Sequence, residues 1–151
     1  DAYTQEMTPK GYNIQTTFRA ADVAGTCNLI VTATPSKKAL LNADEIKPGT
    51  HITAMGSDTP NKIELDPVIL QKADIIVADS IEQSLSRGEI FKARQAGTLA
   101  ENRVVELGNI ITDPSPVRTS DDQISVADLT GVAIQDIQIC KLIAGAISNK
   151  R

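Results

Sequence analysis

One segment, HITAMGSDTPNKIELDP at residues 51–67, carries the residue types that could do chemistry. A β-type run ends at Met55, Gly56 permits an unusual turn, and the polar turn that follows places the carboxylate of Asp58 just past the strand end. Ligands of open α/β sheets bind outside the carboxyl ends of the strands. The pattern therefore allows two interpretations of Asp58, a catalytic acid or base and an ordinary turn-capping residue.

Other ionisable residues receive structural interpretations. His51 is the only histidine and precedes an apolar strand, far from any second ligand-like cluster, so we expect a structural role. Glu82 and Glu89, in SIEQSLSRGEI, are expected on the polar faces of a helix pair. The pair Asp121-Asp122 is typical of the beginning of a helix or strand, and we predict no metal site.

Short β-type runs alternate with helical stretches, and the runs are apolar throughout, as in parallel strands that are covered on both faces. The pattern predicts an α/β fold with short Rossmann-like crossovers. Expected strands are 13–18, 28–33, 51–55, 74–78 and 123–127, and expected helical segments are 20–25, 43–46 (a single turn), 66–72 and 80–95.

The character of the chain changes at Thr112-Asp113-Pro114-Ser115-Pro116, a loop with two prolines. We expect residues 1–112 to form a partial dinucleotide-binding (Rossmann-like) domain and residues 113–151 to form a carboxy-terminal segment. A helix expected at 132–147 is apolar on more than one face, which predicts packing against another domain or subunit.

Bulk properties exclude several classes of protein. The 151 residues are 41% hydrophobic, enough for one core, and the net charge of -4 disfavours nucleic-acid binding. No apolar run approaches a membrane span, so we expect a cytoplasmic protein without a membrane partner. Cys27 and Cys140 lie in apolar runs and are expected in the core.

Four blocks carry a family resemblance: IVTATPSKKALL, GTHITAMGSDTPNKIELDP, DSIEQSLSRGEI and RTSDDQISVADLTGVAIQD. In order and spacing they resemble the ornithine cyclodeaminase and mu-crystallin family, nearest in wording to its ectoine-utilisation cyclodeaminase-like and archaeal-type alanine dehydrogenase members. The resemblance implies NAD or NADP as cofactor and an amino acid or cyclic imine as substrate. It also implies that Asp58 is the general base, which takes a proton from the group that attacks the imine.

The resemblance further implies cofactor contacts, at Thr32, Met55, Gly56, Ser57, Lys62, Leu129 and Thr130. The family often has Ser at the position of Leu129, so a side-chain hydrogen bond is not expected there. From the residue types alone, Thr32 is also a plain β-former and Lys62 an exposed loop lysine.

The glycine-rich turn of a dinucleotide fold is missing, since the nine glycines never occur as GxG. We therefore expect a partial Rossmann-like parallel sheet that lacks the first two strands and the GxGxxG loop, in an incomplete enzyme. Alternatives are a non-catalytic binding module and an inactive remnant. The missing strands would leave open β-edges, so a homo-oligomer, most simply a dimer, is expected.

Overall fold

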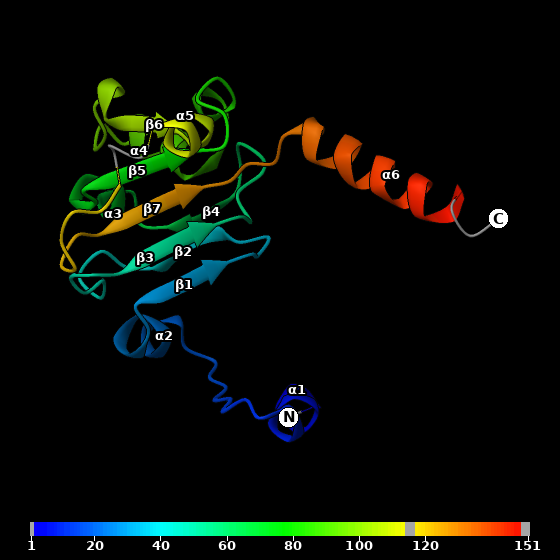
Figure 1. Ribbon diagram of the computed structural model, residues 1–151. Helices are drawn as coiled ribbons and strands as arrows, with labels where there is room; N and C mark the ends of the chain where they lie inside the picture. Colours follow the sequence, from blue (N-terminus) through cyan, green and yellow to red (C-terminus); the bar gives the residue numbers. More distant parts are fainter. Residues whose placement is uncertain (1, 114–116, 149–151) are drawn as a thin grey trace.

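The computed structural model describes residues 2–113 and 117–148 and is built around a parallel sheet (Figure 1). Five strands form this sheet in the order β1-β3-β7-β5-β6, and two more, β2 and β4, form a small parallel sheet beside it. The strands are β1 Leu29–Thr32, β2 Lys37–Leu41, β3 His51–Ala54, β4 Ile63–Leu65, β5 Ile75–Ala78, β6 Val104–Glu106 and β7 Ser125–Asp128. The predicted α/β class with a parallel sheet is confirmed.

Helices precede, connect and follow the strands. They are α1 Ala2–Met7, α2 Ala20–Thr26, α3 Pro67–Lys72, α4 Gly88–Gln95, α5 Leu107–Thr112 and α6 Ala133–Ser148, with 3-10 turns η1 Thr8–Lys10, η2 Gln83–Leu85 and η3 Glu101–Arg103. The start of α3 follows from local chemistry: Pro67 has a fixed φ suited to a first helical position, and the Asp66 carboxylate accepts a hydrogen bond from the amide of Val68 at 2.9 Å.

Strand register aligns the carboxyl ends of four strands. Thr32 lies opposite Ala54, Ala54 opposite Asp128, and Asp128 opposite Ala78. Because the strands are parallel, the loops that follow these four residues leave from one edge of the sheet. The sheet therefore gathers segments that are up to 96 residues apart in sequence, from Thr32 to Asp128.

The same register places buried side chains of neighbouring strands next to one another in the core. Ile30, Ile52, Val126 and Ile76 are successive cross-strand neighbours, and all four are buried. Leu65, Ile69, Leu70 and Ile90, from β4, α3 and α4, are also fully buried in this core. Full burial of each such side chain stabilises the fold by about 1.5–3 kcal/mol, so this layer fixes where the strand ends lie.

Several expectations need correction. Residues 13–18 form no strand and lack a sheet partner, while β1, at the end of the strand order, pairs only with β3. The expected helix at 80–95 is divided into η2 and α4, because Gly88 takes a φ of +90° that breaks helical continuity. Residues 43–45 are a turn, and 46 lies outside it. Elements missed by the sequence pattern are β2, β4, β6 and α5.

The cysteines also differ from expectation. Cys27 and Cys140 are both exposed free thiols, because Cys27 ends α2 and Cys140 lies on α6. The α6 helix exists as predicted but contributes no buried residue, and it extends away from the sheet (Figure 1). Within the described ranges, no helix has the length and apolar character needed to cross a membrane.

Candidate functional site at the carboxyl edge of the sheet

The structure brings the expected site residues to one edge of the sheet. Thr32 ends β1, Met55 to Asp58 follow β3, and Leu129 and Thr130 follow β7. Two backbone hydrogen bonds join these segments: the Met55 amide donates to the Thr32 carbonyl, and the Leu129 amide donates to the Ala54 carbonyl, each at 2.8 Å. The backbone ladder thus continues one residue past β3 and β7.

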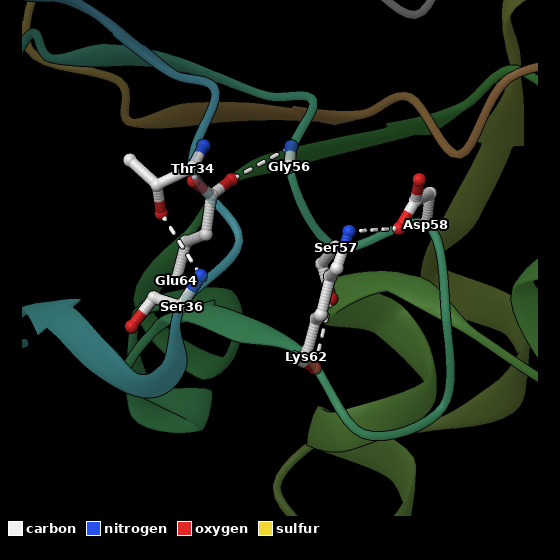
Figure 2. Close-up of polar contacts among 7 residues, drawn as sticks. All are labelled: Thr34, Ser36, Gly56, Ser57, Asp58, Lys62 and Glu64. Atoms are coloured by element: carbon white, nitrogen blue, oxygen red, sulfur yellow. Dashed lines mark hydrogen bonds and ion pairs between the residues drawn. The ribbon is translucent and has the colours of Figure 1, made fainter.

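Asp58 and Lys62 form an ion pair across the turn (Figure 2). The Lys62 ammonium donates a hydrogen bond to Oδ1 of Asp58 at 2.6 Å, and the Ser57 hydroxyl donates to the Lys62 carbonyl at 2.9 Å, which closes the turn. The hydrogen bond from Lys62 is the main reason that the pKa of Asp58 lies below its ordinary value, and the charge of Arg87 acts in the same direction. Asp58 is therefore a carboxylate at neutral pH, and its side chain is half exposed.

Glu64 is one of the residues of the site that the sequence pattern did not identify. Its carboxylate is fully buried beneath the turns that follow β1 and β3 (Figure 2). Oε2 accepts hydrogen bonds from the Thr32 hydroxyl at 2.7 Å and the Gly56 amide at 2.9 Å, while Oε1 accepts one from the Thr34 amide at 2.6 Å. One carboxylate thus holds the turns after two neighbouring strands against each other.

Gly56 is required by this close approach. A Cβ atom at residue 56 would overlap the carbonyl oxygen and the amide nitrogen of Thr34 and Oε1 of Glu64. Because two of these atoms belong to the backbone, the overlap could not be relieved by a side-chain rotation. The structure therefore gives Gly56 a packing role that stands beside the cofactor role implied by the resemblance.

Asp79 holds the third segment. It directly follows β5, and its Oδ1 accepts a hydrogen bond from the Thr130 hydroxyl at 3.2 Å, while Oδ2 accepts one from the Gly131 amide at 2.8 Å. The Ser80 amide also donates to Oδ1, at 2.9 Å. Thr130 is thereby fixed next to the end of β7. Leu129 is half-buried, and its backbone amide donates the hydrogen bond to the Ala54 carbonyl.

Two further carboxyl groups lie under the edge. Glu89 is 1% exposed, so the expectation of a polar helix face is wrong for it, because its side chain turns inward to the backbone of β4. Asp128 is equally buried and accepts a hydrogen bond from the Ile90 amide at 2.8 Å. Burial raises the pKa of Glu89 to about 7 and that of Asp128 to about 7.

His51 lies at the opposite edge, at the amino end of β3. Its Nδ1 is 2.8 Å from the Ser125 hydroxyl and its Nε2 is 3.1 Å from the Thr53 hydroxyl, so both ring nitrogens are engaged in a local network. Burial, followed by the charge of Arg118, lowers the pKa of His51. Residues 2–113 and 117–148 contain no group of three or more His, Cys, Asp or Glu side chains arranged to hold a metal ion.

The sheet order, the parallel crossovers and the loops gathered at the carboxyl edge define a partial Rossmann-like α/β domain. The sequence model of the ornithine cyclodeaminase/mu-crystallin family matches residues 2–151. The chain belongs to this family.

Similar sequences include two types of enzyme. The alanine dehydrogenase of Archaeoglobus fulgidus is 40% identical over 131 residues, which are 86% of this chain and 40% of that protein. The iminosuccinate reductase of Paracoccus denitrificans is 37% identical over 123 residues, or 82% of this chain and 38% of that protein. The chain thus spans about two fifths of the length of these relatives.

Similar solved structures contain nicotinamide cofactors. An archaeal alanine dehydrogenase dimer with bound NAD superposes with a TM-score of 0.88 at 35% identity, covering 99% of this chain and 47% of that one. The Thermococcus litoralis Δ1-pyrroline-2-carboxylate reductase, in complex with NADH and L-proline, superposes with a TM-score of 0.85 at 26% identity, covering 93% of this chain and 44% of that one. Related proteins therefore bind nicotinamide cofactors on the same fold.

Proposed function

We propose that the carboxyl edge of the sheet binds the nicotinamide-ribose end of NAD(H) or NADP(H), in a protein that acts on amino acids or their imines. The reaction is an amino-acid dehydrogenase or imine reductase reaction, or a deamination and cyclisation of the ornithine cyclodeaminase type. Support comes from the relatives, which include an alanine dehydrogenase, an iminosuccinate reductase and ornithine cyclodeaminases at 27–31% identity.

The residues present fit one end of such a cofactor. Thr32 and Thr130 place hydroxyl groups at the ends of β1 and β7, and Met55 offers a half-exposed apolar side chain between those strands. These groups suit a flat ring with an attached ribose, which needs apolar contact and a few hydrogen bonds. The pyrophosphate is usually held by a GxGxxG turn, a pattern that this sequence does not contain.

Asp58 is proposed as the general base. A bound nicotinamide would accept a hydride from the α-carbon of the substrate or return one to it. The part of Asp58 is to take a proton from the water or amine that attacks the imine, and a carboxylate with a lowered pKa is in the acceptor form at neutral pH. The Lys62 ammonium group lies 2.6 Å from Oδ1 of Asp58 and holds that carboxylate at the carboxyl edge of the sheet.

The single observation that carries this proposal is the register. Thr32, Ala54 and Asp128 end adjacent parallel strands, so Thr32 and the loops that carry Asp58 and Thr130 lie at the same edge. A second candidate, a cofactor-binding module without catalysis, is favoured by the ion pair itself, because Lys62 already occupies Oδ1 of Asp58.

We also propose that the protein assembles as a homodimer. Six large apolar side chains of α6 are exposed: Ile134, Ile137, Ile139, Leu142, Ile143 and Ile147. On β1, Leu29 and Val31 are exposed as well. A helix that exposes so many large apolar side chains is typical of one that packs against another subunit.

Binding of the cofactor tests the proposal most simply. Titration of the 151-residue chain with NADH and with NADPH, followed by the nucleotide fluorescence, should give a dissociation constant below about 1 mM for at least one of them. Absence of binding to both would contradict the proposal for this chain. Retained cofactor binding without turnover of any amino acid or cyclic imine would favour the second candidate.

A further inference from the structure

Two threonines at the carboxyl edge share an arrangement that restricts what they can bind. Thr32 is 7% exposed and gives its hydroxyl hydrogen to Oε2 of Glu64 at 2.7 Å. Thr130 is 6% exposed and gives its hydroxyl hydrogen to Oδ1 of Asp79 at 3.2 Å. In both pairs the hydroxyl group of a threonine at the carboxyl edge donates a hydrogen bond to a carboxylate.

The direction of the Thr32 bond is fixed by its surroundings. Glu64 also receives hydrogen bonds from the amides of Thr34 and Gly56, at 2.6 and 2.9 Å. An amide N–H can only donate, and an ionised carboxylate can only accept. Three donors therefore converge on Glu64, and the one hydrogen of the Thr32 hydroxyl is committed to it.

Asp79 repeats the arrangement at the other threonine. The amides of Ser80 and Gly131 donate to its two oxygens at 2.9 and 2.8 Å, so Asp79 also acts as an acceptor toward Thr130. A hydroxyl group has one hydrogen and two acceptor lone pairs. Once the hydrogen is committed, Thr32 and Thr130 can offer a ligand only their lone pairs.

We propose that Glu64 and Asp79 are positioning residues that make Thr32 and Thr130 hydrogen-bond acceptors toward the ligand. The ligand atoms that meet these threonines must then be donors, either the ribose hydroxyls or the carboxamide N–H group of a nicotinamide nucleoside. A phosphate oxygen is excluded from both positions, because it would meet lone pairs with a carboxylate behind them. This inference rests on the proposed function and adds the polarity of the contacts.

The first test concerns only the hydrogen bond from the Thr32 hydroxyl to Glu64 and needs no nucleotide. In nuclear magnetic resonance spectra of the unaltered chain, the hydroxyl proton of Thr32 should exchange slowly with water and show a contact to Glu64, and Glu64→Gln should abolish that protection. Asp66→Asn is the matched control: it removes a carboxylate two residues away that caps α3, a position where Asn also serves as a cap. A rapidly exchanging Thr32 hydroxyl in the unaltered chain would overturn the inference.

The second test is a double-mutant cycle on NADH affinity. Glu64→Gln should raise the NADH dissociation constant about 10-fold, as expected for loss of a hydrogen bond to a charged group. In the Thr32→Val background the same change should raise it less than about 3-fold, because the effect passes through the Thr32 hydroxyl. A purely structural role of Glu64 would give equal changes in both backgrounds and would overturn the inference.

Asp79→Asn with Thr130→Val provides an independent cycle, which remains informative if Glu64→Gln does not fold. Inorganic pyrophosphate serves as the third probe: it should leave the Thr32 and Thr130 resonances unshifted, and shifts at both would contradict the proposed polarity. Failure of the unaltered chain to bind any nicotinamide nucleotide would instead refute the proposed function, and with it the proposed polarity of the ligand contacts. A slowly exchanging Thr32 hydroxyl would still show the hydrogen bond to Glu64 in that case.

Discussion

Oε1 of Glu89 accepts a hydrogen bond from the backbone amide of Glu64 at 2.8 Å. The other oxygen of Glu89 binds the amide of Leu65 at 3.1 Å, and Asp128 binds the amide of Ile90, the residue after Glu89, at 2.8 Å. A series of carboxylate-to-amide bonds therefore runs from the end of β7 through α4 to β4. It ends at Glu64, which holds the turns after β1 and β3.

The burial of Glu89 within this series predicts a dependence of stability on pH. Burial raises the pKa of Glu89 from 4.5 to about 7, so between these values the folded protein binds more protons than the unfolded chain. Stability from this group should be fully present below about pH 4.5 and fall as the pH rises to about 7. Glu89→Gln should reduce the fall in the free energy of unfolding over this pH range by on the order of 2 kcal/mol. Urea unfolding from pH 4.5 to 8 measures it.

Two other groups bear on the measurement. The pKa of Asp128 is raised in the same way, to about 7, whereas the pKa of His51 is lowered and favours stability at higher pH. Both groups remain in the Glu89→Gln variant, and the charge of Asp128 also raises the pKa of Glu89, so the difference between the two curves reports Glu89 together with its coupling to Asp128. Parallel curves for the variant and the parent chain would show that Glu89 does not titrate in this range.

Gly56 gives a prediction about packing. Gly56→Ala would force the new Cβ against the Thr34 backbone and Glu64, so it should lower the free energy of unfolding by about 1–3 kcal/mol. Gly108→Ala is the control, since a Cβ at that helical residue meets no atom within 4 Å and alanine favours helices. Chemical denaturation of both variants checks the prediction. Equal free energies of unfolding for Gly56→Ala and Gly108→Ala would show that the close approach does not exclude a Cβ atom at residue 56.

Sequence patterns predicted the sheet because its core strands are short apolar runs, such as those around Ile52 and Ile76. They did not predict the buried role of Glu64 and Glu89, since acidic residues are rarely buried and the partners are backbone amides from distant segments. One signal was present: Glu64 lies between Ile63 and Leu65 in an apolar stretch, IEL, that proves to be β4. The expected strand at 13–18 failed because a strand requires a paired neighbour, which single-chain periodicity does not reveal.

Asp58 gives a prediction about catalysis. In a preparation that turns over an amino acid or cyclic imine with NAD(H) or NADP(H), Asp58→Asn should reduce kcat by roughly 100-fold or more, because an amide cannot accept the proton. Cofactor affinity should change little. Asp121→Asn, an exposed carboxylate before β7, provides the control for the loss of one charge. Undiminished turnover of Asp58→Asn would remove Asp58 from the mechanism.

The apolar surface of α6 gives a prediction about assembly. The chain should sediment as a dimer, and Leu142→Gln should shift the equilibrium toward the monomer, because Leu142 is 69% exposed on a helix without buried residues. Lys141→Gln changes the adjacent residue without removing apolar area and should leave the dimer intact. A compact monomer at all concentrations would contradict the proposed assembly.

The position of the nucleotide on the sheet is the central claim, and nuclear magnetic resonance titration with NADH measures it directly. If the nucleotide binds there, chemical-shift changes should appear at the carboxyl edge, concentrated in Thr32, residues 55–58 and residues 129–130. Residues of the opposite edge, such as His51 and Gln123, should not shift. Saturable shifts confined to the carboxyl edge would support the account, and shifts located elsewhere, or none up to several times the roughly 1 mM limit set above, would contradict it.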